Sequence, residues 1–290
     1  MTIDRRTFLA TMGSAALAIR GAGAASISRL GVQLYTVRSL LEKDFDGTLA
    51  AVAAIGYTEV EFGGYFQHPP EEVRDTLKRH RLTAPSAHTP YESLTGDAWT
   101  RAIQDARTIG HRYLVNAWVE EPIRNQPDAW KRIADTYNRA GEVSKRAGIQ
   151  FAYHNHNFEF APRDDAGGKL PYDLLLESCD PDLVKMEMDL CWIASAGKDP
   201  LEYFRRYPGR FPMVHVKGLR KIPASGAAAP IDSVVADMTA VGQEDTIDWK
   251  RIFAQARAAG IQHYFVEHDK PQDPLESLKA SRDYLTRLQF

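Results

Sequence analysis

The sequence predicts an α/β protein that folds as a single closed (β/α)8 barrel of the TIM type. Two observations lead to this prediction: short apolar runs alternate with longer segments of helical spacing, and eight such pairs occupy about 260 residues. A third observation argues against an open, dinucleotide-binding sheet, because no G-x-G-x-x-G motif follows the first strand. We therefore expect one barrel domain over residues 26–290, without an internal linker.

The eight expected strands are short and rich in Val, Ile, Phe and Tyr, the residues that strands favour. In chain order they cover residues 31–37, 58–62, 82–88, 112–117, 149–156, 183–189, 212–217 and 263–267. Between them lie helical patterns such as residues 48–55 and 247–259, which stop at Gly56 and Gly260. Glycine ends helices readily because it adopts the left-handed backbone conformation.

Two connections, residues 157–169 and 218–246, are too long and too polar to be ordinary turns. Each follows an expected strand, which places it at the C-terminal face of the barrel, where active sites of this fold lie. Loops of this length are usually functional or disordered. We expect them to form a lid over a substrate, and a disordered insertion is the alternative.

The composition excludes several classes of protein. Lys and Arg number 36 against 38 Asp and Glu, so no basic excess exists to bind nucleic acid phosphates. Two cysteines, Cys179 and Cys191, are too few for a disulfide-rich scaffold or a cysteine-ligated zinc site, although one bridge between them stays open. No apolar run reaches the ~18 residues that a membrane-spanning helix needs.

Residues 1–25 have the features of a twin-arginine export signal. Arg5 and Arg6 are adjacent, an apolar stretch follows, and small residues at 21–25 provide a cleavage site. A chance Arg-Arg pair ahead of an amphipathic helix is the alternative interpretation. The signal predicts a periplasmic mature protein, for which free sugars and glycosides are better substrate candidates than phosphorylated cytoplasmic metabolites.

Titratable side chains gather where the fifth to eighth expected strands end. In chain order they are His154 and His156, Glu187 and Asp189, His215 and Lys217, and Glu267. Side chains two residues apart on a strand share one face, so each pair faces the same way. Burying such groups in a barrel mouth is costly unless they are paired or coordinate a metal. Mixed nitrogen and oxygen donors predict one divalent cation (Mn, Co, Fe, Zn or Mg) rather than Ca.

These strand ends resemble those of the sugar phosphate isomerase/epimerase family, the xylose isomerase-like barrels that also include endonuclease IV. The matching segments are residues 153–160 (YHNHNFEF), 188–192 (MDLCW), 214–217 (VHVK) and 265–267 (FVE). The resemblance covers nearly all of residues 30–288. It implies one divalent metal held by side chains of strands five to eight, which here are His154, Asp189, His215 and Glu267.

The sequence departs from the family pattern at the fifth strand. Relatives usually place a glutamate where this chain has His154, and His156 lies two residues further on. The fifth-strand ligand therefore stays open between these two histidines. A second departure follows Lys217, where the family often continues to an aspartate and this chain has Gly218.

The resemblance also implies proton abstraction from a carbon next to a carbonyl, with a metal stabilising the enediolate. His156, Glu159 and Glu187 are candidate bases, Lys217 would offset charge on the enolate oxygen, and His88 would bind a hydroxyl or move a proton. We predict a sugar isomerase or epimerase acting on a non-phosphorylated sugar or keto-sugar. The alternatives are a keto-glycoside or keto-sugar lyase or dehydratase of the same fold, and a non-catalytic sugar-binding barrel.

A phosphodiesterase resembling endonuclease IV is the remaining class. It would need several metals, more histidine and aspartate ligands and a basic DNA-facing surface, which this composition does not supply. The expected partner is a small carbohydrate rather than nucleic acid. Barrels of this family often form dimers, so the resemblance also makes a homodimer possible.

Overall fold

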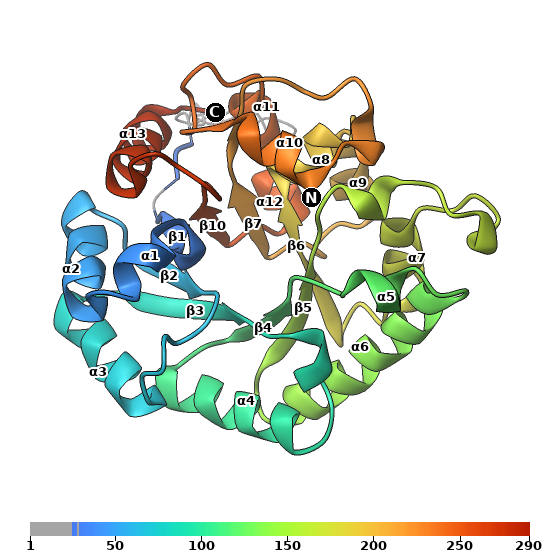
Figure 1. Ribbon diagram of the computed structural model, residues 1–290, viewed down its shortest axis with the longest axis horizontal. Helices are drawn as coiled ribbons and strands as arrows, with labels where there is room; N and C mark the ends of the chain where they lie inside the picture. The colour runs from blue at the N-terminus through green and yellow to red at the C-terminus, as the bar shows by residue number, and fades with distance from the viewer. Residues whose placement is uncertain (1–24, 28) are drawn as a thin grey trace, which may run out of the picture.

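The computed structural model describes residues 25–27 and 29–290 and confirms the expected barrel (Figure 1). Eight parallel strands close in the order β1-β10-β7-β6-β5-β4-β3-β2. Their bounds are β1 Gly31–Gln33, β2 Glu59–Phe62, β3 Thr83–His88, β4 Tyr113–Asn116, β5 Gln150–His154, β6 Val184–Asp189, β7 Met213–Val216 and β10 His263–Val266. The expected export signal lies, except for Ala25, outside the described residues.

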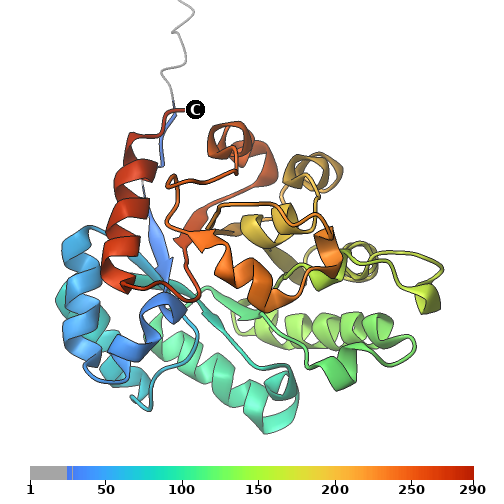
Figure 2. The same cartoon turned by 45° about the horizontal axis from the view of Figure 1, so that its top comes forward.

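Helices follow the circumference of the barrel, as Figures 1 and 2 show for α2, α3, α4 and α6. Their bounds are α1 Arg38–Leu41, α2 Phe45–Ile55, α3 Pro70–His80, α4 Gly96–Ile109, α5 Glu121–Arg124, α6 Ala129–Arg146, α7 Pro171–Ser178, α8 Leu190–Ser195, α9 Pro200–Arg206, α10 Ile231–Ala236, α11 Trp249–Phe253, α12 Ala256–Ala259 and α13 Pro274–Arg287. The helix expected over residues 247–259 is divided into α11 and α12. Both expected glycine stops are confirmed, because Gly56 and Gly260 have φ of +106° and +86°.

Several strands end earlier than the sequence suggested, because local side-chain contacts turn the backbone out of the barrel. After β1 a 3-10 helix (Leu34–Val37) begins, and the Gln33 side chain accepts a hydrogen bond from the Tyr35 N–H at 3.0 Å. After β5 the His156 N–H donates to the Glu159 carboxylate at 2.9 Å instead of to a neighbouring strand. As a result His154 ends β5, and His156 lies in the loop that follows.

The interior of the barrel is layered along its axis. An apolar layer in the middle consists of Tyr113, Val115, Ala152, Met213 and Phe265. The Phe265 ring fills the space beside β1, where a Cβ on Gly31 would come within 2.5 Å of the ring, so this strand position requires glycine. The apolar layer separates two polar layers, and the larger of these lies at the C-terminal ends of the strands.

Both long connections contain secondary structure. Residues 157–169 hold two short 3-10 helices, and residues 218–246 hold the antiparallel pair β8 (Gly218–Leu219) and β9 (Met238–Thr239) as well as α10. Asn157 Nδ2 donates to the Ala229 carbonyl at 2.8 Å and joins the two connections. The first residue of α10 lines the cavity at the barrel mouth. This position suits a lid, and closure over a substrate stays a prediction.

Two expectations about the whole chain can be compared with the described residues. Cys179 and Cys191 are buried free thiols, so the disulfide that the sequence left open is not formed. Within residues 25–27 and 29–290, no helix combines the length and the apolar character that crossing a bilayer would require.

Candidate active site

Buried polar side chains form a layer at the C-terminal ends of the strands. The register of the parallel strands places His154 of β5 beside Glu187 of β6, and Asp189 of β6 beside His215 of β7. All four side chains are buried. The barrel therefore brings together the residues that the sequence predicted from separate strand ends.

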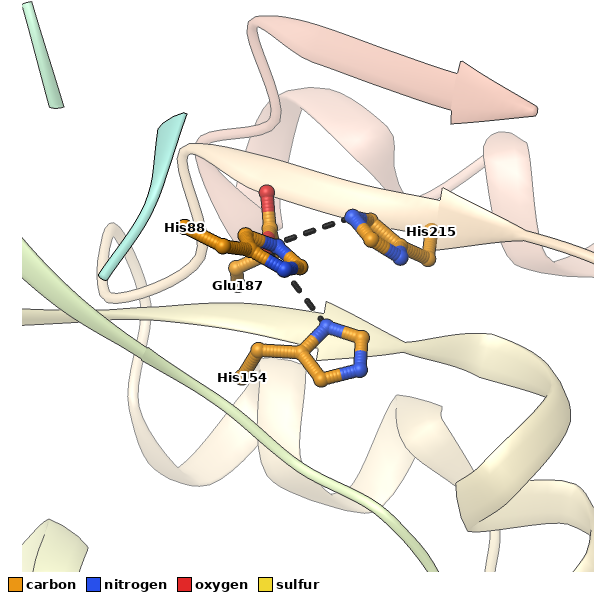
Figure 3. A group of neighbouring side chains, drawn as sticks. All are labelled: His88, His154, Glu187 and His215. Atoms are coloured by element: carbon orange, nitrogen blue, oxygen red, sulfur yellow. Dashed lines mark hydrogen bonds and ion pairs between the residues drawn. The ribbon is translucent and has the colours of Figure 1, made fainter. Parts of the chain in front are cut away.

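Four of the predicted residues form a group that we call the inner group: His88, His154, Glu187 and His215 (Figure 3). Each histidine places one ring nitrogen near the same oxygen, Glu187 Oε2. The distances are 3.1 Å from His88 Nε2, 3.5 Å from His154 Nδ1 and 3.2 Å from His215 Nε2. Three imidazoles from three strands thus surround one carboxylate oxygen.

Asp189, His215 and Glu267 form the outer group, which shares His215 with the inner group. His215 Nδ1 lies 2.8 Å from Glu267 Oε2 and 3.9 Å from Asp189 Oδ2. Lys217 Nζ lies 3.2 Å from Asp189 Oδ2 and 2.8 Å from Glu267 Oε2. A third carboxylate, that of Asp269, contacts the same ammonium at 2.9 Å. The buried lysine is therefore bound on three sides by acidic groups.

Sequence reasoning missed Glu61, a fully buried residue of β2. Its Oε2 lies 2.6 Å from His215 Nε2 and 3.2 Å from His88 Nε2. Gln33 Nε2 and Ser86 Oγ donate to its two oxygens at 2.7 and 2.6 Å. The signal was the alternation of Glu59-Val60-Glu61-Phe62, which turns both acidic side chains to one face of the strand. Asp269 was missed as well, since it lies beyond the last expected strand.

His156 and Glu159 are close in sequence but lie on different sides of the site wall. The His156 ring lines the cavity, packs edge-on against Trp118 and stacks with Phe158. The Glu159 carboxylate is fully buried, accepts the His156 N–H, and receives a hydrogen bond from the Tyr153 hydroxyl. It is absent from the residues that line the cavity, so it supports the loop that carries His156.

Two of the imidazoles are held in the neutral form. Burial lowers the pKa of His154 well below 6.5, and the neighbouring His215 lowers it further. Burial also lowers the pKa of His156 well below 6.5, with a further contribution from the Lys217 ammonium. A neutral imidazole can bind a metal or accept a proton, so both side chains are in the form that either role requires.

The other two imidazoles show that carboxylates are in excess. Burial opposes the charged form of His88, but Glu61 and Glu187 outweigh it and raise the pKa of His88 to about 9. Burial opposes the charged form of His215 in the same way, and the same two carboxylates raise the pKa of His215 well above 6.5. This end of the barrel therefore attracts positive charge, which a bound cation would provide.

The residues present fit a divalent cation. Within the described chain, His154 Nδ1 and Glu187 Oε1 are buried polar atoms without a hydrogen-bond partner, and Asp189 Oδ2 has an ion pair with Lys217 but no hydrogen bond. Buried polar atoms are normally hydrogen-bonded, so such atoms in one cluster indicate a site that is completed by a bound species. Imidazole nitrogens and carboxylate oxygens without a thiolate suit Zn, Mn, Fe or Co.

A cavity of about 580 Å³ opens above this cluster. Its floor includes His88, His154, His156, Lys217 and Glu267, whereas Glu187 lies beneath and does not reach the cavity. Its walls contain four aromatic and two acidic side chains, namely Tyr35, Tyr91, Trp118, Trp192, Glu92 and Glu120. Among the described residues that line the cavity, Lys217 is the single Lys or Arg, and carboxylates already surround it.

Comparisons with known proteins agree with this fold. Inosose dehydratase from Lacticaseibacillus casei is 24% identical over 260 residues, which cover 81% of this chain and 85% of that protein. Inosose dehydratase from Clostridium tetani is 27% identical over 273 residues, covering 84% and 89%.

Among solved structures, a sugar phosphate isomerase/epimerase from Parabacteroides distasonis is similar with a TM-score of 0.73 and 26% identity. The match covers 94% of this chain and 97% of that one. The family model described as Xylose isomerase-like TIM barrel matches residues 49–288. The chain therefore belongs to the Xylose isomerase-like TIM barrel family.

Proposed function

We propose that this protein is a metal-dependent lyase that removes water, or another β-substituent, from a neutral keto-polyol. The observation that carries the proposal is the floor of the cavity, where candidate metal ligands, the Lys217 ammonium and the neutral His156 imidazole meet. The curated relatives named inosose dehydratases favour this lyase over the isomerase or epimerase that we predicted from the sequence. An inosose is a cyclic keto-polyol, which is the substrate class that we propose.

The proposed reaction begins with the loss of a proton from the carbon next to the carbonyl. His156 is the base, because it alone among the three predicted bases lines the cavity and its imidazole is neutral. The electron pair of the broken C–H bond forms the enolate and then the C=C bond as the β C–O bond breaks. The imidazolium returns its proton to the leaving hydroxide, so the products are an unsaturated ketone and water.

Negative charge develops on the carbonyl oxygen during proton loss and has to be stabilised. When bound, a divalent cation supplies Lewis-acid stabilisation of that oxygen. Lys217 Nζ adds a charged hydrogen-bond donor at the cavity floor, and its contacts with Asp189, Glu267 and Asp269 hold it in place. Because these contacts exist before substrate binds, little reorganisation is needed during the reaction.

The cavity walls support a substrate without phosphate. A phosphate dianion is usually bound by free arginine or lysine side chains or by backbone N–H groups at a helix N-terminus. Here Glu92 and Glu120 line the walls, and the one lysine is already paired. Carboxylates accept hydrogen bonds from hydroxyl groups, and the partly exposed Trp118 offers an aromatic surface for a polyol ring.

The function is tested with purified protein loaded with Zn²⁺, Mn²⁺ or Co²⁺ and incubated with an inosose or a 3-keto-glycoside in D₂O. We expect loss of water or aglycone, seen by proton NMR and by the ultraviolet absorbance of the enone. Interconversion of isomers with deuterium uptake but without elimination would instead support the isomerase or epimerase. Binding without any exchange would support the sugar-binding barrel, and turnover restricted to sugar phosphates would contradict the cavity argument.

We further propose that the enzyme acts in the periplasm, as the Arg5-Arg6 pair predicts. Fractionation of cells that express the full chain is expected to place the protein with periplasmic markers. Changing both Arg5 and Arg6 to Lys should retain it in the cytoplasm. Equal distribution of both forms would contradict the proposal.

A further inference from the structure

We propose that the N-terminal end of the barrel carries a second binding site, which takes a phosphate group, either free or as a monoester. The site is a cavity of about 670 Å³ that shares no lining residue with the cavity at the C-terminal end. The proposal concerns binding alone and needs no metal. It therefore does not depend on the proposed lyase function.

Three arginines from separate segments line this cavity. Arg29 precedes β1, Arg112 precedes β4 and Arg257 belongs to α12. The described residues that line it include no Asp or Glu, whereas four acidic residues line the cavity at the C-terminal end. Charges of one sign that line a concave surface focus the electric field, so this cavity attracts anions.

The charge of these arginines is largely uncompensated. Among the described residues, their single ion pair is the one between Arg29 Nη1 and Glu59 Oε1, at 3.8 Å. Arg112 and Arg257 are exposed residues that pair with no described carboxylate. At least two guanidinium groups are therefore available to a ligand that enters the cavity.

The backbone that carries these arginines is fixed by the barrel. The Arg112 N–H donates to the Pro85 carbonyl at 2.8 Å, and the Arg112 carbonyl accepts the Gln150 N–H at 2.9 Å. The Arg257 carbonyl accepts the N–H of Gly260, which has φ of +86° and ends α12. Only side-chain rotamers need to change when a ligand binds, which limits the loss of entropy.

The floor of the cavity contains an imidazole with one unsatisfied nitrogen. His263 lines the cavity and is 4% exposed, and its Nδ1 lies 2.8 Å from Glu59 Oε2. Its Nε2 is buried and has no hydrogen-bond partner within the described part of the chain. Because buried polar atoms are normally hydrogen-bonded, this nitrogen is a second sign that a bound species completes the site.

The chemistry of these groups favours phosphate over other anions. Guanidinium groups bind phosphate oxygens through paired N–H donors, and three of them can surround a tetrahedral group that has three free oxygens. A phosphate also suits His263 Nε2 in either state of the ring, since its oxygens accept a hydrogen bond and its P–OH donates one. A carboxylate can only accept.

The size and charge of the molecule favour a small ligand over a nucleic acid. A volume of about 670 Å³ lies within the range of about 300–1,000 Å³ that is usual for small-molecule sites. The chain as a whole has 36 Lys and Arg against 38 Asp and Glu, so no extended basic surface is available to a polyanion.

The test measures phosphate binding by calorimetry with the full chain, after metal has been removed by a chelator, in a low-salt buffer without phosphate. Inorganic phosphate and glucose 6-phosphate are the probes, and succinate is the carboxylate comparison. We expect one phosphate per chain and weaker binding, by about tenfold, in Arg112→Gln and in Arg257→Gln. Arg107→Gln is the matched control, because Arg107 is an exposed residue of α4 outside the cavity.

A second measurement needs no variant. Phenylglyoxal modifies exposed arginines, and mass spectrometry locates the modified residues. Phosphate is expected to protect Arg112 and Arg257 from modification but not Arg107. Tighter binding of glucose 6-phosphate than of inorganic phosphate would identify a phosphate monoester as the ligand, and equal binding would identify free phosphate.

Three results would overturn the proposal: no phosphate binding, phosphate binding that is equal in Arg112→Gln, Arg257→Gln and Arg107→Gln, or succinate binding as tight as that of phosphate. Turnover of a keto-polyol by a protein that binds no phosphate would refute this proposal alone. Phosphate binding by a protein that turns over no keto-polyol would refute the proposed function alone.

Discussion

The barrel holds a buried histidine–glutamate pair at each end, and the two ends differ in what surrounds the pair. Glu59 and Glu61 are two residues apart on β2, and both point into the barrel. At the N-terminal end Glu59 meets one imidazole, that of His263, at 2.8 Å. At the C-terminal end Glu61 contacts both His215 and His88, which are themselves joined to further carboxylates.

Charge balance separates the two ends. A cavity of about 670 Å³ at the N-terminal end is lined by Arg29, Arg112 and Arg257, and Arg29 Nη1 lies 3.8 Å from Glu59 Oε1. At the C-terminal end the Lys217 ammonium contacts three carboxylates, those of Asp189, Glu267 and Asp269, and two further buried carboxylates, Glu61 and Glu187, contact His88. A buried histidine–glutamate pair alone, such as His263 and Glu59, can therefore be structural. A convergence of such groups with uncompensated negative charge indicates a site for a cation.

The largest effect is expected from a change of His156. It tests whether the chemistry takes place at the C-terminal end of the barrel. Replacing His156 by Gln removes the proposed base while keeping a polar side chain of similar size. Turnover of the keto-polyol is expected to fall about 10²–10⁴-fold, because general-base catalysis contributes that much. Zinc content should stay at its original value, since His156 belongs to neither metal group. A loss of turnover smaller than tenfold would assign the base to another residue.

The second prediction compares the side chains that pair with buried carboxylates at the two ends of the barrel. These are Lys217 at the C-terminal end and His263 at the N-terminal end. Lys217→Met leaves Asp189 and Glu267 without their ammonium, and an uncompensated buried charge costs about 3–5 kcal/mol of stability. His263→Gln at the other end is expected to cost about 1–3 kcal/mol, the cost of one lost buried hydrogen bond. Urea unfolding in the presence of a chelator measures both.

Added zinc then distinguishes the ends. It should stabilise Lys217→Met more than His263→Gln, because removing the ammonium leaves the Asp189 and Glu267 carboxylates without a cation. Equal stabilisation of the two variants would mean that the loss of the ammonium does not strengthen cation binding at the C-terminal end.

The third prediction concerns Glu159, which contacts the His156 loop but does not line the cavity. Burial raises the pKa of Glu159 to about 7, against the opposing hydrogen bonds from Tyr153 and the His156 N–H. A raised carboxyl pKa favours the protonated folded state, so its contribution to stability is complete below about pH 4.5. That contribution is lost as the pH rises through about 7, and the full loss is about 3 kcal/mol.

Glu159→Gln should remove this pH dependence while leaving zinc affinity unchanged. The free energy of unfolding of the variant, relative to the unaltered protein, is therefore expected to rise between pH 4.5 and 7. Parallel pH profiles would show that Glu159 is not protonated in the folded state. A change in zinc affinity would extend the site to this residue.

The fold was predictable from the sequence because each strand carries its own signal. All eight barrel strands lie within the expected ranges, since apolar runs bounded by helix stops depend on local residues. The strand ends were less predictable. β5 ends at His154 because Glu159 bonds the His156 N–H, a contact that depends on how the following loop folds.

The site was predictable in part, for the same reason. Residues of strands five to eight follow one another in the sequence, so their shared edge could be inferred from parallel pairing. Glu61 could not be assigned in this way. Alternation shows that it faces the barrel interior, but its contact with His215 spans 154 residues and exists only because the barrel closes. Which carboxylate meets which imidazole depends on that closure.

The smallest expected effect compares the two glutamates of β2 directly. Glu61→Gln removes a carboxylate that adjoins the inner group, whereas Glu59→Gln makes the same chemical change below the apolar layer, beside His263. A residue that supports metal ligands typically contributes about tenfold or more to affinity, which corresponds to about 1.4 kcal/mol. Competition with a zinc-binding dye should therefore show weaker binding in Glu61→Gln and unchanged binding in Glu59→Gln. Equal affinities in the two variants would mean that the charge of Glu61 does not act on the ion.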